Sequence, residues 1–444
     1  MIVCRLNTAH LSPLHEGYST HVWGDSGSVY KLLAVIQTPL SSNLSLQPTQ
    51  RSLTRIIHMK TIKPTDDVQE QQRQADESFP ESLDERRRRW AHLLYGLHYE
   101  SVLCDVLSEE LPKYINSCVI DASDVVTHMR ECALILASAP QIFFAAVEGS
   151  LVGRILRDAD VQAEYAVIQQ QAYHQPSIYI HLLADEEGNA PTPNQYLVIC
   201  DMVRDYIGED RSEHAGHIDR TTPSVVSTEA SEPGYRKYLH TLRTNRSPRR
   251  VATFERLCAG ITRRCSQIPP HSHNKPLQYP PAEVGYALHA HKRLAQHHAH
   301  HSSNYVMNLV EDICTYLFRT NGLTQHFKMH QFIIYLIFRP SQAAIAEIFC
   351  SGLLQCWVDG GGGFNAYPAG RSIASSRKVS VDEWLRHETL ARQMSSLGER
   401  IAVLKERSEA WRKALDWQVQ DGDDQLENKD PKKAEEGPDP MDES

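Results

Sequence analysis

The chain has 444 residues and lacks the patterns from which the chemistry of a protein is most often inferred. Its ten cysteines are scattered, with no Cys-x-x-Cys pair, which argues against both a disulfide scaffold and a thiolate zinc site. There is no Gly-x-Ser-x-Gly motif of a serine hydrolase. No apolar run approaches the roughly 20 residues that cross a bilayer, and residues 1–17 lack the apolar core of a signal peptide. We therefore expect a protein of the nucleus or cytoplasm without a membrane segment.

The net charge of −9 conceals two segments of opposite sign. Residues 236–300 contain twelve Lys and Arg against two Glu, a net charge of +10. Residues 419–444 contain ten Asp and Glu against three Lys, a net charge of −7. A basic middle is compatible with contact to DNA or RNA. It is equally compatible with a solvated basic linker, in which case the acidic segment serves only solubility.

Apolar spacing divides the chain into regions. Residues 1–85 have little long apolar periodicity and include a charged, Gln-rich stretch, so we expect them to be largely disordered. Residues 86–175 carry apolar side chains at three- and four-residue steps, which predicts a helical region. Residues 380–418 predict a long amphipathic or coiled-coil helix, and residues 419–444 predict a disordered acidic tail.

The segment 176–375 mixes strand and helix patterns. Residues 177–183 and 282–287 are short and rich in Ile, Tyr, Val and Ala, as in strands, and are separated by a long basic insertion, about 184–281. Residues 332–338 are continuously apolar and β-prone, which is typical of a central strand buried on both faces. The sequence therefore predicts an α+β fold, with a small mixed or antiparallel sheet flanked by helices.

A heptad stripe of apolar residues runs between Trp384 and Leu415, where four- and three-residue steps alternate. About four heptads can support a coiled coil, so self-association through this stripe is one expectation. The other is a single amphipathic helix lying on its own domain.

Phosphodiester hydrolysis requires an activated water, charge neutralisation at phosphorus and help for the leaving oxygen. Several residues of the chain have side chains suited to these tasks. Glu347 stands in an apolar helical run, where an unpaired carboxylate is costly to bury, and so suits a metal ligand. Arg293 lies about two helical turns beyond the expected strand end at Gly285 and suits a phosphate clamp. His297, one turn further on the same helix face, could assist proton transfer or phosphate binding.

These residues, in this order, resemble the GIY-YIG nuclease module. In that family two name-giving triplets lie on adjacent strands, and an arginine follows eight residues after the second glycine, as Arg293 follows Gly285. A metal-binding glutamate then follows an apolar strand, and an asparagine closes the module. The resemblance covers about residues 176–183 and 280–370.

The resemblance implies a metal-dependent endonuclease acting on DNA or RNA. Glu347 would hold Mg²⁺ or Mn²⁺, Arg293 would clamp the phosphate, and Tyr179, in the first triplet, would be the possible base. Gly285 would permit close approach of the substrate, and Asn365 would close the module.

The chain departs from the family pattern in three places that leave a second reading open. The second triplet begins with Glu283 where the family has a tyrosine, and the insertion separates strands that a short hairpin usually joins. The interval from Glu347 to Asn365 is also lengthened by the glycine run. A diverged module that no longer cuts is the alternative. Such a protein would be a nucleic-acid-binding, scaffold or regulatory protein that acts through its basic stretch and its C-terminal helix.

Two further clusters admit simple interpretations. Six histidines lie between His289 and His301; the pair His297 and His301 could chelate zinc with a third ligand, or the cluster could be a titrating surface. The four glycines 360–363 lack the Lys-Ser/Thr continuation of a phosphate-binding loop, so we expect a flexible loop there.

Overall fold

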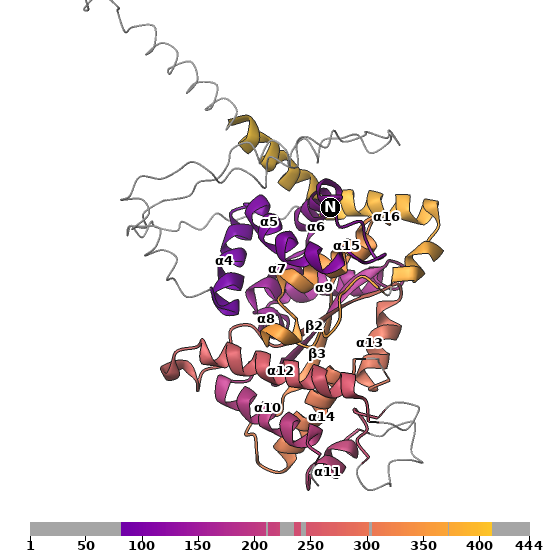
Figure 1. Cartoon of the computed structure of the whole chain (residues 1–444). Helices are drawn as coiled ribbons and strands as arrows, with labels where there is room; N and C mark the ends of the chain where they lie inside the picture. Colours follow the sequence, from indigo (N-terminus) through magenta and orange to yellow (C-terminus); the bar gives the residue numbers. More distant parts are fainter. Residues whose placement is uncertain are drawn as a thin grey trace, which may run out of the picture.

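The computed structural model describes most of the chain from residue 81 onwards. The described ranges are 81–209, 212–222, 235–240, 246–301, 304–371 and 373–410. They form a mixed α+β fold in which helices surround a small antiparallel sheet, which confirms the expected class (Figure 1). The N-terminal region expected to be disordered, 1–85, lies outside the described residues except for its last five, and the acidic tail 419–444 lies outside them altogether.

The sheet has three strands: β1 (Ser177–Ala184), β2 (Ala282–Ala287) and β3 (Lys328–Leu336). Their order is β2-β1-β3, and β1 is antiparallel to both neighbours. The expectation that the apolar run 332–338 is the central strand is therefore wrong, because every residue of β1 is buried between its two partners. The strand β3 is an edge strand that helices α7, α9 and α14 cover, which explains its apolar composition.

A layer of helices precedes β1 and packs around the first hydrophobic core (upper part of Figure 1). Its elements are α4 (Leu83–Tyr95), α5 (Tyr99–Glu110), α6 (Val125–Ser138), α7 (Gln141–Glu148), α8 (Leu151–Arg157) and α9 (Ala159–Gln171). The helix α4 begins within the region expected to be disordered, because Ser82 and Glu85 form a reciprocal capping box there. The helices α5 and α6 pack against α15 (Gln342–Leu353), which follows β3.

The insertion between β1 and β2 is a helical lobe with its own hydrophobic core, in the lower part of Figure 1. It contains α10 (Pro193–Ile207), α11 (Ala215–Asp219) and α12 (Pro248–Ser266). These helices pack with α14 (Tyr305–Arg319), while α13 (Ala290–His298) lies beside the sheet. Short 3₁₀ helices complete the secondary structure at Leu111–Tyr114, Pro270–Ser272, Val358–Gly360 and Ile373–Lys378.

The glycine run 360–363 is a packed contact, and the expectation of a flexible loop is wrong. A Cβ atom on Gly363 would lie 1.8 Å from the carbonyl oxygen of Ala282, and one on Gly361 would lie 2.4 Å from that of Gly260 in α12. Gly361 also has a positive φ of 70°, which side chains disfavour. The run therefore allows the backbone to touch β2 on one side and the insertion lobe on the other.

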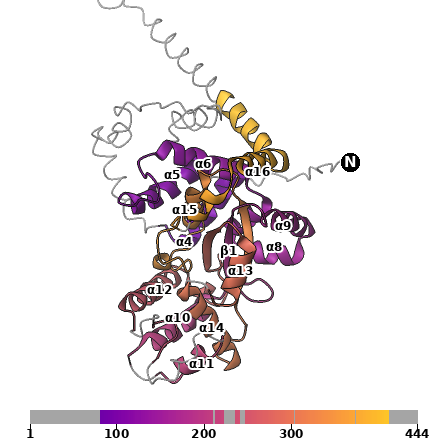
Figure 2. The ribbon, with the colours of Figure 1, turned by 90° about the vertical axis from the view of Figure 1, so that its right-hand side faces the viewer.

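The C-terminal stripe does not form one long helix. The helix α16 (Val381–Met394) ends at Ser395, which is extended, and a second helix occupies 397–410. Ser395 separates them because its hydroxyl accepts a hydrogen bond from the amide of Leu397. Leu397 and Leu404 are buried in the first core, and Arg400 donates to the carbonyls of Leu136 and Ala139. The described part of the stripe thus lies on its own domain, at the end of the molecule opposite α11 (Figures 1 and 2).

Among the described residues, no single helix is both long and apolar enough to cross a bilayer. Only α6 and α7, which meet at an angle of 105°, meet the length and hydropathy criteria when taken together as a broken span.

We predict that Gly260→Ala lowers the free energy of unfolding by about 2–3 kcal/mol. The new Cβ would lie 2.3 Å from the carbonyl oxygen of Val358 and would force α12 away from the glycine run. Urea denaturation followed by circular dichroism measures this. The matched control is Gly398→Ala, which meets no atom within 4 Å and, in a helix, should raise stability by a few tenths to about 1 kcal/mol. If Gly260→Ala and Gly398→Ala changed the free energy of unfolding equally, the close contact between α12 and the glycine run 360–363 would be contradicted.

Candidate active site

Polar side chains gather on one face of the sheet, where β1 pairs with β2. Tyr179 lies opposite Gly285, and His181 lies opposite Glu283. Because alternate residues of a strand point to the same face, all four positions lie on one side of the sheet. The insertion does not disturb this pairing, since β1 and β2 stay adjacent and antiparallel across it.

Gly285 makes room for the ring of Tyr179. A Cβ atom at position 285 would lie 2.3 Å from the hydroxyl oxygen of Tyr179 and 2.4 Å from its Cζ. The expected purpose of this glycine was close approach of a substrate. The structure assigns it a more specific one, because the tyrosine ring itself lies across the glycine.

Glu283 and His181 form a buried pair. The Nδ1 atom of His181 lies 2.7 Å from Oε2 of Glu283. Burial by itself raises the pKa of the Glu283 carboxyl, but the hydrogen bond from His181 and the positive charge of Arg293 outweigh it, so the pKa lies below its ordinary value. Glu283 is therefore ionised at neutral pH.

The helix α13 brings Arg293 and His297 to the hydroxyl of Tyr179. The Nε of Arg293 donates to that oxygen at 3.4 Å, and Nε2 of His297 lies 3.2 Å from it. None of the ion pairs among the described residues involves Arg293, so its guanidinium has no carboxylate partner there. His297 is 1% exposed, and burial lowers its pKa to about 3, which keeps the imidazole neutral.

Tyr179 stays protonated at neutral pH. It is 2% exposed, and burial, reinforced by the charge of Glu283, raises the pKa of its hydroxyl far above the usual range. The neutral hydroxyl can donate one hydrogen bond and accept others.

Glu347 reaches the same place from α15. Its Oε2 accepts a hydrogen bond from the amide of Gly370 at 3.0 Å. Burial raises the pKa of the carboxyl to about 7, and the charge of Glu283 adds to the effect. A carboxylate that is this costly to ionise gains most from a bound cation.

Asn365 fixes the edge of β2. Its Oδ1 accepts from the amide of Val284 at 3.1 Å, and its Nδ2 donates to the carbonyl of Val284 at 3.0 Å and to the Ser351 hydroxyl at 3.3 Å. The asparagine therefore acts as an extra bridge at the outer edge of the strand.

One cleft of about 600 Å³ collects most of these residues. Its lining includes the following side chains or backbone positions: Tyr179, Glu283, Gly285, Arg293, Glu347 and Asn365. Five residues that the sequence singles out thus meet in one place. The sixth, His297, is not in the lining and contacts the Tyr179 ring from within the protein.

Sequence reasoning missed the role of His181. The available signal was its position two residues after Tyr179 on an expected strand, which puts the two side chains on one face. In the sequence, Glu283 stands out only as a departure from the family triplet. Its pairing with His181 depends on the strand register, which the sequence does not specify when about 100 residues intervene.

The histidine cluster does not form the His297–His301 chelate that was one of its two interpretations. The helix α13 ends at His298, so His297 and His301 do not share a helix face, and His297 is buried whereas His301 is exposed. His300 instead contacts Glu311 at 3.0 Å. The three residues His181, Glu283 and His297 do have ligand atoms within 4.8 Å of one another, so they and Glu347 are the groups of this site that could hold a metal.

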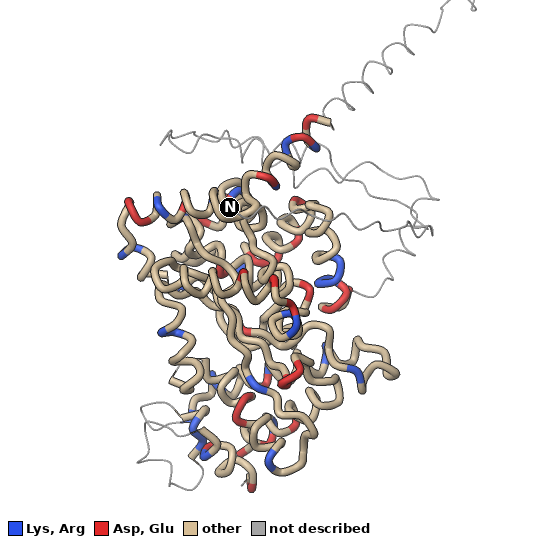
Figure 3. Tube along the Cα trace, turned by 180° about the vertical axis from the view of Figure 1, so that it is seen from behind, with Lys and Arg blue, Asp and Glu red and all other residues tan. Residues whose placement is uncertain are grey.

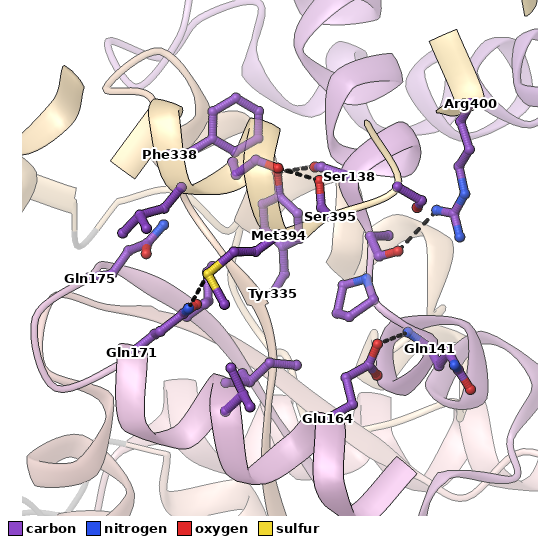
Figure 4. Close-up of a pocket in the computed structure, with 18 residues that line it drawn as sticks. Ser138, Gln141, Glu164, Gln171, Gln175, Tyr335, Phe338, Met394, Ser395 and Arg400 are labelled. Carbon is purple, nitrogen blue, oxygen red and sulfur yellow. Dashed lines mark hydrogen bonds between the residues drawn. The ribbon is translucent and has the colours of Figure 1, made fainter. Parts of the chain in front are cut away.

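A second cavity, of about 470 Å³, lies between α9, β3 and α16 (Figure 4). Its ionisable groups already have structural partners: Glu164 accepts the amides of Gln141 and Ile142 at the start of α7, and Arg400 binds backbone carbonyls. Gln171 donates to the sulfur of Met394 across the opening. This cavity therefore offers no convergent reactive groups.

Comparisons of the chain with family models, with curated proteins and with solved structures find no match in any of the three. The function is therefore inferred from the cleft and from the order of its residues along the chain.

We predict that Glu347→Gln stabilises the metal-free protein above neutral pH. A carboxyl whose pKa is raised by folding makes no difference below the unfolded value near 4.5, and stability is lost as the pH rises to about 7. Relative to the variant, the wild type should lose on the order of 2 kcal/mol over that window. Denaturation at several pH values with EDTA measures the difference, and added Mn²⁺ should restore stability only to the wild type.

The matched control is Glu311→Gln, which should act with the opposite sign. Burial raises the pKa of Glu311, but the hydrogen bonds from His300 and the Met329 amide outweigh it, so the pKa lies below its ordinary value. That carboxylate stabilises the fold above pH about 4.5, and its replacement should cost stability. If the free energies of unfolding of the wild type and of Glu347→Gln changed in parallel with pH, the raised pKa of Glu347 would be contradicted.

Proposed function

We propose that the cleft is the active site of a metal-dependent endonuclease that hydrolyses phosphodiester bonds in DNA or RNA. The observation that carries the proposal is the convergence of Tyr179, Arg293 and Glu347, which come from β1, α13 and α15, on one cleft. A phosphate clamp and a metal ligand have to reach the same phosphate group. If Arg293 and Glu347 formed an ion pair with each other, their closeness would be explained by that pair alone and would not support an active site. No such pair exists for Arg293 among the described residues.

The order of elements supports a GIY-YIG-like module. The two triplets lie on adjacent antiparallel strands, Arg293 lies on the helix after the second strand, and Glu347 lies on the helix after β3. The insertion lobe occupies the connection between β1 and β2 and leaves their pairing intact, as a module with an expanded hairpin requires.

The residues present fit a hard divalent cation. Glu347 supplies a carboxylate oxygen at the cleft, and a bound divalent cation would offset the cost of ionising it that burial imposes. Mg²⁺ or Mn²⁺ held there would neutralise charge on the phosphate and stabilise the leaving oxygen.

Arg293 would bind the non-bridging oxygens of the phosphate, since its guanidinium carries a fixed charge and several donors. The neutral hydroxyl of Tyr179, held by Arg293 and His297, would orient the attacking water. This assigns Tyr179 a positioning role in place of the base role expected from its triplet, because its raised pKa keeps it protonated.

Glu283 is the better proton acceptor. It lines the cleft, is held ionised by His181, and stands where the family triplet has a tyrosine. In the proposed step the water oxygen bonds to phosphorus and its proton passes to Glu283. The phosphorus–oxygen bond to the leaving group breaks, and that oxygen finally receives a proton, giving one phosphomonoester and one hydroxyl end.

The second candidate is a nucleic-acid-binding or scaffold protein in which the module keeps its fold and has lost catalysis. The burial of Tyr179 and the replacement of the second tyrosine by Glu283 favour it. Self-association through the stripe from Trp384 to Leu415 belongs to this reading, and its residues beyond 410 lie outside the described part of the chain.

We predict metal-dependent cleavage of plain or branched DNA or RNA by the purified chain, and a loss of about 10³-fold or more in Glu347→Ala. Arg293→Ala should lose about 10²-fold, because a phosphate clamp acts chiefly in the transition state. Gel assays with Mg²⁺ or Mn²⁺ measure both. Glu186→Ala, an exposed carboxylate outside the cleft, should cut at the wild-type rate. Equal activity in Glu347→Ala and wild type would point to a contaminating nuclease.

We predict that Glu283→Gln loses about 10²-fold or more in kcat, as expected for a general base. His181→Leu, which has no hydrogen-bond donor, should instead move the acidic limb of the kcat/KM profile to higher pH. Without the His181 hydrogen bond the pKa of Glu283 rises toward and above its ordinary value, so the base is protonated sooner as pH falls. The limb belonging to Glu347 would shift with metal concentration, whereas that of Glu283 would not. An unmoved limb in His181→Leu at saturating metal would refute the assignment.

A further inference from the structure

The mouth of the cleft has an aromatic wall next to the reacting groups. Tyr305, the first residue of α14, and Tyr367 both line it, and their hydroxyl groups lie 2.8 Å apart. Lys292 and Arg371 line the same opening. Aromatic faces beside cations are the usual equipment of surfaces that bind a nucleic-acid strand, because they accept stacked bases and phosphates together.

The insertion lobe reaches this wall through the N-terminal end of α12. The guanidinium of Arg249 lies 4.5 Å from the ring centroid of Tyr367, and that of Arg250 lies 4.5 Å from that of Tyr305. Arg250 also donates hydrogen bonds to the carbonyls of Tyr238 and His240, so its side chain stabilises the insertion lobe. Arg249 is exposed and has no carboxylate partner among the described residues.

The other arginines of α12 have internal partners. Arg256 pairs with Asp359, and Arg264 pairs with Asp84. Figure 3 accordingly shows acidic positions interspersed with basic ones over the described trace. Among the described cations of the segment 236–300, the ion-paired ones are Lys237, Arg256 and Arg264. Arg249 is an exposed cation beside the cleft without a carboxylate partner among the described residues.

We infer that Arg249 and Tyr367, with Lys292 and Arg371 beside them, form a rim that binds the polynucleotide strand next to the scissile phosphate. The inference rests on the proposed function and deepens it, because it assigns the substrate as a polymer. Arg249 would contact a neighbouring phosphate, and a base would stack on the Tyr367 and Arg249 planes. The insertion lobe would thereby extend the cleft to recognise several nucleotides.

The test separates binding from cutting. The full chain carrying Glu347→Gln, in EDTA, is titrated with fluorescent single-stranded and duplex oligonucleotides at several salt concentrations. Adding Arg249→Ala should raise Kd about tenfold and reduce the slope of log K against log salt by about 0.7–0.9, the value of one phosphate contact. Tyr367→Ala should raise Kd by about 5- to 100-fold with the salt slope unchanged. Arg249→Lys should recover part of the affinity and the slope.

Arg256→Ala is the matched control, since it removes an arginine from the same helix that is paired with Asp359. Its Kd should equal that of the parent, and equal thermal midpoints would verify folding. An Arg249→Ala protein that binds like Arg256→Ala would overturn the rim. The rim would also be overturned if polyglutamate bound as tightly as the oligonucleotides and depended on Arg249 to the same extent, since the rim would then recognise negative charge alone.

A second measurement distinguishes the rim from the proposed function. With otherwise wild-type protein, turnover of a small phosphodiester such as bis-p-nitrophenyl phosphate should not depend on Arg249, whereas cleavage of an oligonucleotide should. Arg249-dependent binding without any cleavage by the wild type would sustain the rim and refute the endonuclease. Cleavage of oligonucleotides that is indifferent to Arg249 would sustain the endonuclease and refute the rim.

Discussion

The contact between the ring of Tyr179 and the backbone of Gly285 is the constraint on which the cleft depends. It fixes the register of β1 against β2, and that register in turn sets His181 opposite Glu283. A shift of one residue would send every side chain of β2 to the other face of the sheet and would disperse the polar cluster. The same contact leaves the tyrosine hydroxyl where α13 can reach it with Arg293.

The cleft brings together ionisable groups whose charged forms are disfavoured by burial. Glu347 resists ionisation and His297 resists protonation, while Glu283 keeps its charge only because His181 and nearby cations hold it. Perturbed pKa values of this kind cluster at functional sites. Here they leave Glu283 ionised at neutral pH, His297 neutral and Glu347 titrating near pH 7. The rest of the fold has to be stable enough to hold this arrangement, and two hydrophobic cores, both of which include side chains of the sheet, provide that stability.

The fold class and the segments that form the strands could be predicted from the sequence, because local patterns determine them. The residues that meet in the cleft are far apart in the chain, and it was the resemblance to a known module that grouped them. Sequence reasoning failed where long-range packing decides. The apolar run of β3 is explained by helices that cover an edge strand, and the glycines 360–363 are explained by backbones that meet from β2 and α12. The heptad pattern continued through Ser395, yet the hydroxyl of that serine ends one helix and begins another. The roles of Glu283 and His181 required a register across the insertion, which no local signal supplies.

The docking of α12 on the glycine run has a consequence for how the sheet is assembled. Pairing β1 with β2 closes a loop of about 100 residues, and a flexible loop of that length carries a closure entropy that short hairpins avoid. The lobe reduces this penalty, because a compact insertion keeps the carbonyl of Pro281 within 2.9 Å of the amide of Leu183, so that its entrance and exit are neighbours. Cleft geometry is therefore coupled to the integrity of a lobe that contributes no reacting group, and a chain shortened to a minimal hairpin would lose that internal brace.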